Sequence, residues 1–307
     1  MRVAVIGVGH LGRHHARILA SLSGVTLVGV ADTDADRAAQ VAAEYGTAVF
    51  ADARDLAGRV DAVVVSVPTS SHAAVALPLL EAGIGALVEK PLSRTVGEAD
   101  QLIAAAARTG AVLAVGHSER FNPAVAAARP YVRDPRFIEV HRLGTLPGRS
   151  LDIDVVFDLM IHDLDLILHF IDSPVEAVEA VGVPVLTPRV DIANVRLRFA
   201  NGCIANLTAS RISREPVRKI RFFQRDAYVS IDTAAREVEV WRLAPQASGL
   251  PTIAGGKLDV PAEEPLKKEL EDFVDAVRHR RDPEVTGDQG RAAIALAARI
   301  VDLMGPA

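Results

Sequence analysis

The sequence predicts an α/β protein in which a doubly wound parallel sheet is followed by an α/β domain with an open, mostly antiparallel sheet. Three observations predict this fold class. The first ~118 residues alternate short β-branched runs with alanine-rich stretches, which is typical of a parallel sheet with right-handed crossovers. A glycine-rich turn directly follows the first of these runs. Beyond this region, longer strand-like runs follow one another across turn residues, as in antiparallel hairpins.

The first domain is expected to cover residues 1–119. Its apolar runs of four to six residues do not alternate strictly, which favours strands buried on both faces. The expected strands are 2–6, 26–31, 48–50, 62–67, 86–89 and 112–115. The expected helices between them are 11–22, 35–45, 53–57, 71–82 and 96–108.

The second domain is expected to cover residues 120–307, with its last helix free to pack back on the first domain. Helices are predicted over 121–129, 156–170 and 291–304, and another is indicated by the apolar stripe Leu266, Leu270, Phe273, Val274 and Val277. The stretch 250–265, rich in Pro and Gly, is predicted to be a surface loop. The expected strands are 137–143, 175–185, 192–199, 203–212, 218–224, 228–232 and 237–243.

Composition excludes several classes of protein. The 307 residues carry a formal net charge of −5, which argues against general binding to nucleic acid or to an anionic membrane. Cys203 is the only cysteine, so an internal disulfide and a four-thiolate zinc site are both excluded. No apolar run approaches the ~18–20 residues that a membrane helix needs, and glycines interrupt the N-terminal run. We therefore expect a cytoplasmic protein.

The motif Gly7-Val8-Gly9-His10-Leu11-Gly12 predicts a Rossmann dinucleotide site, because it follows the first strand and opens the first helix. Gly7 permits the tight turn, Gly9 lets the backbone approach a pyrophosphate, and Gly12 permits close packing of helix on strand. The helix N-terminus then supplies N–H groups to the phosphates. Asp32, at the end of the second strand, is placed to bind a ribose 2′-hydroxyl. This carboxylate favours NAD over NADP, and Arg37 lies too far along the chain to reverse that expectation.

Two further strand ends are predicted to face the cofactor. After the fourth strand, Pro68, Thr69 and His72 are candidate cofactor contacts, whereas Ser70 and Ser71 serve equally well as helix caps. After the fifth strand comes Glu89-Lys90-Pro91. A lysine there is desolvated, which lowers its pKa toward that of a useful base. The alternative at this point is a surface ion pair.

A polar stripe crosses an otherwise apolar helix. Asp158, His162, Asp165 and His169 follow one another at i, i+4, i+7 and i+11, so they share one face. Three interpretations compete: a solvated face, a metal site, and an acid–base pair in which Asp158 orients His162 to take a substrate proton. The early histidines His10, His14 and His15 are interpreted as solvated or as lining the cofactor loop, and no metal is expected there.

Together these motifs resemble the Gfo/Idh/MocA family, which includes glucose–fructose oxidoreductase and inositol dehydrogenase. The resemblance rests on the glycine motif, on Glu89-Lys90-Pro91, on the run from Gly116 to Pro123, and on Asp158-x3-His162. It implies an NAD-dependent dehydrogenase with a nicotinamide bound between two domains. It further implies that Lys90, Asp158 and His162 are catalytic, that Glu89 and Lys90 contact the cofactor, and that the second sheet forms homodimers or homotetramers.

Within the family, the second half of the chain is most similar to bacterial nucleotide-sugar branches that serve lipid A biosynthesis, which implies oxidation at C3 of UDP-N-acetylglucosamine. Substrate contacts are then expected from Lys90, Asn122, Arg149, Asp158, His162 and Arg211, since the planar fork of arginine matches a diphosphate. Arg142, Arg214 and Arg218 belong to the same set of candidate arginines, for which surface exposure is the simpler interpretation. Two alternatives stay open: an enzyme that oxidises or reduces an unphosphorylated sugar or polyol, and a non-catalytic NAD(H)-binding regulator.

Overall fold

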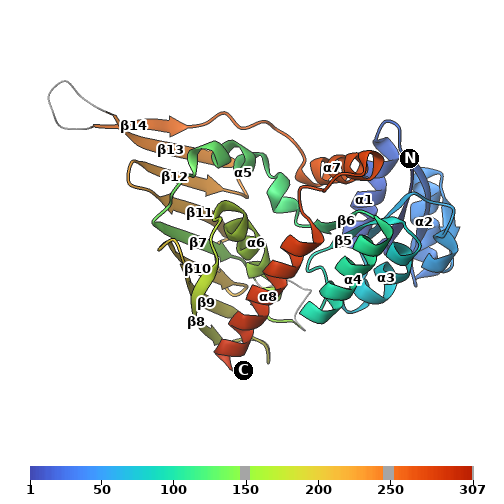
Figure 1. The fold of residues 1–307 in the computed structure, drawn as a ribbon, viewed down its shortest axis with the longest axis horizontal. Helices are drawn as coiled ribbons and strands as arrows, with labels where there is room; N and C mark the ends of the chain where they lie inside the picture. The colour runs from blue at the N-terminus through green and yellow to red at the C-terminus, as the bar shows by residue number, and fades with distance from the viewer. Residues whose placement is uncertain (146–152, 245–251, 306–307) are drawn as a thin grey trace. The chain divides into compact units, whose positions relative to one another are not determined.

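The computed structural model describes residues 1–145, 153–244 and 252–305 (Figure 1). The chain divides into two compact units, each of which takes up two separate parts of the sequence. Unit 1 comprises Met1–Ser118 and Glu264–Ile294, and unit 2 comprises Glu119–Glu263 and Ala295–Ala307. The sequence therefore returns to unit 1 for 31 residues after most of unit 2, whereas a return was expected only for the last helix of the chain.

Unit 1 contains a six-stranded sheet in which every pairing is parallel. Its strand order is β3-β2-β1-β4-β5-β6, the dinucleotide-binding order, so the predicted Rossmann sheet is confirmed. The order reverses between β1 and β4, and the carboxyl ends of these two strands therefore flank the crevice in which such sheets bind ligands. The strands are β1 (Arg2–Ile6), β2 (Thr26–Ala31), β3 (Ala48–Phe50), β4 (Ala62–Val65), β5 (Gly85–Glu89) and β6 (Leu113–Gly116).

Helices cover this sheet on both faces, as right-handed crossovers require (Figure 1). Helices α1 (His10–Ser21) and α2 (Ala35–Tyr45) share an apolar core with α7 (Pro265–His279), which joins them from far along the chain. Helices α3 (His72–Glu81) and α4 (Val96–Thr109) pack on each other and on strands β4 to β6. Two short 3-10 turns, Ala53–Leu56 and Thr69–Ser71, complete the connections.

Unit 2 contains an eight-stranded sheet of order β14-β13-β12-β11-β7-β10-β9-β8. All its pairings are antiparallel except that of β7 with β10, so the predicted open, mostly antiparallel sheet is confirmed. Strand β14 was not predicted, and it occupies part of the expected loop 250–265. The strands are β7 (Phe137–Leu143), β8 (Val175–Val183), β9 (Ile192–Phe199), β10 (Ile204–Ser210), β11 (Val217–Phe223), β12 (Ala227–Asp232), β13 (Glu237–Ala244) and β14 (Thr252–Lys257).

Helix α5 (Pro123–Ala128) and a longer helical segment pack on the sheet of unit 2. The predicted helix 156–170 has the expected extent, but its first part, Val156–Met160, is a π-helix that continues into α6 (Ile161–Phe170). Helix α8 (Gly287–Met304) begins in unit 1 and ends in unit 2. Two further 3-10 turns cover Ser118–Phe121 and Arg129–Tyr131. Within the described ranges, no helix combines the length and the apolar character that crossing a membrane would require.

Arg211 is fully buried, which corrects the prediction that it binds a substrate diphosphate. Its Nε donates to Asp191 Oδ1 at 2.9 Å, and its Nη2 donates to the carbonyl of Ile153 at 2.7 Å. Burial raises the pKa of Asp191, but the hydrogen bonds from the backbone N–H groups of Val185 to Thr187 lower it by more, so the pKa lies well below its ordinary value. The pair is therefore ionised and holds the end of β10 to the loop before β9.

Breaking this pair should be costly, because it leaves a buried carboxylate without its counter-ion. We expect Arg211→Met to lower the free energy of unfolding by about 3–5 kcal/mol, measured by urea denaturation. Arg214→Met, which changes an exposed arginine three residues away, is the matched control and should change it by less than about 0.5 kcal/mol. Equal stabilities for the two variants would contradict a structural role for Arg211.

Candidate active site

The glycine loop between β1 and α1 has the geometry of a phosphate-binding turn. Gly7 has φ +84°, and a Cβ there would lie 2.5 Å from the Ser66 carbonyl oxygen at the end of β4. A Cβ on Gly12 would lie 1.8 Å from the Gly7 carbonyl oxygen, so only glycine permits this packing of α1. In contrast, a Cβ on Gly9 would meet no atom of the described chain within 4 Å. Gly7 and Gly12 are thus packed against backbone atoms, whereas the space beside Gly9 is free, so that a ligand can approach the helix N-terminus there.

Asp32 lies at the end of β2, directly beside this loop. Its Oδ2 accepts the Val8 N–H at 2.8 Å and its Oδ1 accepts the Asp34 N–H at 2.9 Å, so the carboxylate also fixes the two loops. The Arg37 guanidinium reaches Asp32 at 3.4 Å and Asp34 at 2.8 Å. Arg37 therefore lies closer to the predicted ribose site than its place in the sequence suggested. Asp32 is largely buried, with 7% of its side chain exposed, whereas 42% of the Arg37 side chain is exposed.

His72 ties the loop after β4 to the loop after β5. Its Nδ1 lies 2.9 Å from the Pro91 carbonyl oxygen and its Nε2 lies 3.0 Å from the Val67 carbonyl oxygen. Burial lowers the pKa of His72, although both carbonyls favour its charged form. The imidazole is buried and both of its nitrogens face these carbonyls, which does not fit the predicted direct contact with a cofactor. Thr69 is half-buried and Pro68 exposed in the same loop, and both stay predicted contacts.

Lys90 follows the last residue of β5, and its side chain is half-buried at the carboxyl end of the sheet. The Lys90–Pro91 peptide bond is cis. The neighbouring Glu89 carboxylate is buried: its Oε1 lies 2.7 Å from His15 Nε2, and its Oε2 accepts the Lys90 backbone N–H at 3.2 Å. His15 is fully buried, which corrects the interpretation of this residue as solvated. The contact of Glu89 with a cofactor stays a prediction.

Burial raises the pKa of Glu89, but the hydrogen bond from His15 and the nearby charge of Lys90 outweigh it, so the pKa lies below its ordinary value. Glu89 is therefore a carboxylate at neutral pH. Because the attraction between two charges is mutual, this carboxylate also stabilises the ammonium form of Lys90. The half-buried Lys90 side chain is thus accompanied by an adjacent negative charge.

In unit 2, Asp158 lies in the π-helix and His162 in the first turn of α6, and both side chains are half-buried. A π-helix inserts an extra residue into a turn and is frequent at functional sites. Because its turn is wider than an α-helical turn, the polar residues before and after it do not share the single face that regular helical spacing predicts. Asp165 is buried against Arg120, with the Arg120 Nε 2.7 Å from Asp165 Oδ2.

His169 completes this second group, since its Nδ1 lies 2.6 Å from the Arg120 Nη1. Burial and the charge of Arg120 lower the pKa of His169 to about 4, so it is neutral at physiological pH. The four polar residues therefore divide into a structural group around Arg120 and the pair Asp158 and His162, which alone keeps its predicted acid–base role.

Two other predicted substrate contacts belong to the interior of unit 2. Asn122 is buried: its Oδ1 accepts the Ala124 N–H and so caps α5, and its Nδ2 donates to Glu119 and to the Thr233 carbonyl, so both of its N–H groups are used within unit 2. Among the other candidate arginines, Arg142 is buried in a two-pronged pair with Asp163 at 2.8 Å. Arg149 lies outside the described residues.

The comparisons with known proteins agree with this architecture. A family model described as "Oxidoreductase family, NAD-binding Rossmann fold" matches residues 1–117, and the model of the GFO/IDH/MocA C-terminal domain matches residues 149–229. UDP-N-acetylglucosamine 3-dehydrogenase of Acidithiobacillus ferrooxidans is 42% identical over 98% of this chain and 96% of its own length. The chain belongs to the Gfo/Idh/MocA family. It is accordingly a dehydrogenase with an NAD-binding Rossmann domain.

A second relative and two solved structures are similar to the chain over nearly its whole length. A scyllo-inositol 2-dehydrogenase (NAD(+)) of Bacillus subtilis is 26% identical over 93% of this chain and 89% of its own length. The solved Acidithiobacillus ferrooxidans UDP-N-acetylglucosamine 3-dehydrogenase superposes with a TM-score of 0.92 at 40% identity, covering 99% of this chain and 97% of that chain. Levoglucosan dehydrogenase in complex with NADH and levoglucosan gives a TM-score of 0.88 at 20% identity over 99% and 97% of the two chains, which shows the shared fold.

The glycine loop makes a prediction that separates folding from cofactor binding. We expect Gly9→Ala to keep the wild-type Tm, because its Cβ enters open space, and to weaken NADH binding at least about tenfold, or ~1.4 kcal/mol. Gly12→Ala should instead lower the Tm, because its Cβ meets the Gly7 carbonyl. Differential scanning fluorimetry and NADH fluorescence titration measure the two effects. A Gly9→Ala variant that binds NADH normally would remove this loop from the cofactor site.

Proposed function

We propose that this enzyme uses NAD to oxidise a hydroxyl group of a nucleotide sugar to a ketone. The proposed substrate is UDP-N-acetylglucosamine, oxidised at C3. Similarity to UDP-N-acetylglucosamine 3-dehydrogenase over 98% of the chain is the observation that carries the proposal. The placement of Lys90 at the carboxyl end of β5, on the ligand-binding edge of the parallel sheet, supports the same chemistry.

NAD fits the residues present in unit 1. The open space at Gly9 and the N-terminus of α1 would receive the pyrophosphate, and the carboxylate of Asp32 would accept a hydrogen bond from the adenosine ribose. When bound, the nicotinamide supplies the acceptor for the hydride that leaves the sugar carbon. The protein must hold that carbon within about 3–3.5 Å of the acceptor and remove the hydroxyl proton.

We assign the proton transfer to His162 and the stabilisation of charge to Lys90. The ionised Glu89 next to Lys90 favours an ammonium group, which stabilises the developing negative charge on the sugar oxygen. A neutral imidazole can take the proton near physiological pH, and Asp158, four residues earlier, is the candidate to orient it. Lys90 belongs to unit 1 and His162 to unit 2.

We further infer that the protein forms homodimers or homotetramers through the sheet of unit 2 and works in the cytoplasm, where NAD and nucleotide sugars occur. Large apolar side chains are exposed at both ends of this sheet: Val181 is 58% exposed on the edge strand β8, and Ile253 is 69% exposed on the opposite edge strand β14. Grouped exposed apolar residues are typical of protein interfaces.

Lys90→Met tests the proposed chemistry. The variant keeps the length of the side chain but loses its charge, so we expect turnover to fall by about 10²–10³-fold while NADH binding survives. The rate of NADH formation, followed by absorbance, measures turnover, and Lys267→Met, a change at an exposed lysine of α7, is the control. Turnover close to that of the wild type would exclude Lys90 from catalysis.

The same assay distinguishes the substrate classes. UDP-N-acetylglucosamine should be oxidised with a kcat/KM far above those of N-acetylglucosamine and myo-inositol. Preference for myo-inositol would overturn the nucleotide-sugar assignment in favour of a polyol dehydrogenase, and NADH binding without oxidation of any of the three would favour the regulator.

The cofactor preference tests Asp32 and Arg37 together. The wild type should prefer NAD, because the Asp32 carboxylate repels a 2′-phosphate. In Asp32→Asn the exposed Arg37 guanidinium remains, so the ratio of kcat/KM for NAD to that for NADP should fall about tenfold, or ~1.4 kcal/mol. The double variant Asp32→Asn, Arg37→Ala should not gain activity with NADP. Wild-type preference for NADP would contradict the proposed role of Asp32.

A further inference from the structure

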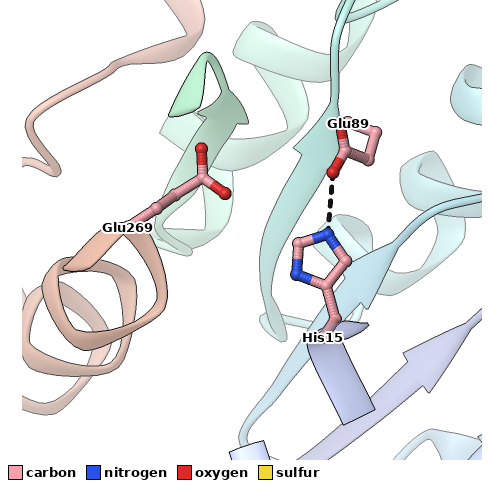
Figure 2. A group of neighbouring side chains, drawn as sticks. All are labelled: His15, Glu89 and Glu269. Carbon is pink, nitrogen blue, oxygen red and sulfur yellow. Dashed lines mark hydrogen bonds and ion pairs between the residues drawn. The ribbon is translucent and has the colours of Figure 1, made fainter. Parts of the chain in front are cut away.

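Three ionisable side chains from distant parts of the sequence form a buried cluster inside unit 1 (Figure 2). His15 comes from α1, Glu89 from the end of β5, and Glu269 from α7. Their exposed fractions are 0%, 7% and 2%, and one nitrogen or oxygen from each lies within 4.8 Å of those from the other two. Figure 2 shows the Glu269 side chain extending from its helix toward the other two residues. The proposed dehydrogenase chemistry does not yet use Glu269.

The cluster contains one made hydrogen bond and several unused polar atoms. His15 Nε2 and Glu89 Oε1 are 2.7 Å apart. His15 Nδ1 and both carboxyl oxygens of Glu269 are buried, and no atom of the described residues hydrogen-bonds to them. Buried polar atoms in native proteins nearly always find a partner, and internal water supplies it where protein atoms do not. These atoms therefore indicate an internal water site between α1 and α7.

The protonation states of the two carboxyl groups differ. Glu89 is ionised, as argued above. Burial raises the pKa of Glu269 well above its ordinary value, and the negative charges of Glu89 and Asp272 raise it further. The raised pKa favours the protonated form of Glu269, which can donate a hydrogen bond, whereas an ionised carboxylate cannot.

Geometry favours a water molecule in the cluster over a metal ion. Ligands of a tetrahedral zinc ion, each at 2.0–2.1 Å from the metal, lie roughly 3.3 Å apart, whereas His15 Nε2 and Glu89 Oε1 are 2.7 Å apart, the length of a strong hydrogen bond. A water molecule that bridges two groups spans roughly 4.6 Å. The separations of up to 4.8 Å in the cluster accommodate such a bridge.

We propose that Glu269 is a positioning residue for Lys90, acting through His15 and Glu89. The protonated Glu269 carboxyl group donates through an internal water to His15 Nδ1, which leaves the proton of the neutral imidazole on Nε2. His15 then donates this Nε2–H to Glu89, and Glu89 remains ionised beside the Lys90 ammonium. The inference rests on the proposed role of Lys90 in the dehydrogenase reaction, and it assigns to α7 a part in setting the charge at the active site.

The charged and titratable groups around this network come from four elements. Asp272 lies on α7 with Glu269. On α3, the charge of Glu89 acts to raise the pKa of His72. Lys90 follows β5, and His15 lies on α1. Glu89 directly precedes Lys90 in the sequence, and its Oε2 accepts the Lys90 backbone N–H.

The pH dependence of stability tests the proton on Glu269 without any assay of activity. Above pH 4.5, the ordinary value for Glu, the unfolded chain releases this proton while the folded chain keeps it, so wild-type stability declines as the pH rises. Glu269→Gln has no such proton. Its Tm minus that of the wild type should therefore increase steadily from pH 5 to pH 8.

Glu271→Gln, which changes a more exposed carboxylate of the same helix, is the matched control, and its Tm difference should stay nearly constant over this range. A constant or decreasing difference for Glu269→Gln would show that Glu269 is ionised and would overturn the proposal. A stoichiometric metal in the purified wild type, detected by elemental analysis and lost in Glu269→Gln, would overturn it as well.

The pH profile of kcat tests the link to Lys90. The amide of Glu269→Gln can still donate, so this variant should keep the wild-type profile. In His15→Phe, Glu89 loses its hydrogen-bond donor, and in Glu269→Leu that donor loses the group that fixes its tautomer. Burial then favours the protonated form of Glu89, which no longer stabilises the Lys90 ammonium. The alkaline limb of the profile should then move to lower pH by about one unit.

An unchanged profile in folded Glu269→Leu and His15→Phe would overturn the positioning role. This failure differs from failure of the proposed function. If Lys90→Met retains turnover, Lys90 is not catalytic, whereas the Tm series still reports whether Glu269 carries a proton.

Discussion

The constraint on which unit 1 depends is the ionised, buried carboxylate of Glu89 at the end of β5. A charge removed from water must be met by hydrogen bonds or by an opposite charge, and Glu89 has both in His15 and Lys90. Room for it depends on Gly116 of the adjacent strand, where a Cβ would lie 3.0 Å from Glu89 Oε2. Because His15 lies on α1, the helix whose N-terminus faces the phosphate loop is also fixed to the strand that ends at Lys90. Cofactor binding and the placement of the lysine thus share one buried hydrogen bond.

Unit 2 fixes its candidate residues in a different way, through buried arginine–carboxylate pairs. Arg142 of β7 holds Asp163, and Arg120 holds Asp165, so the helix that follows the π-turn is fixed at two points. Buried pairs of this kind add little net stability compared with apolar packing, but each forms only when the helix lies in one position along the sheet. His162 lies in the first turn of that helix and Asp158 in the π-helix that precedes it, and their position therefore depends on pairs that are not part of the chemistry.

The sequence was sufficient for features whose signal is local. The glycine motif, the buried strand runs and the alternation in the second sheet each involve neighbouring residues, and the two sheets have the predicted character. Features that depend on distant partners were missed. His15 was interpreted as solvated because its partners, Glu89 and Glu269, come from β5 and α7. Arg211 was taken for a diphosphate ligand because nothing near it in sequence indicates Asp191 as its partner. The π-helix has no compositional signature, so a regular helix was the natural expectation.

The central claim is that Lys90 of unit 1 and His162 of unit 2 act on the same hydroxyl group of one sugar. The most direct test is a crystal structure of the protein with NADH and UDP-N-acetylglucosamine bound. The account predicts that Lys90 Nζ and a ring nitrogen of His162 both lie within about 2.6–3.2 Å of the same sugar oxygen. A bound sugar whose nearest hydroxyl contacts neither side chain, or contacts them through two different oxygens remote from the nicotinamide, would contradict it.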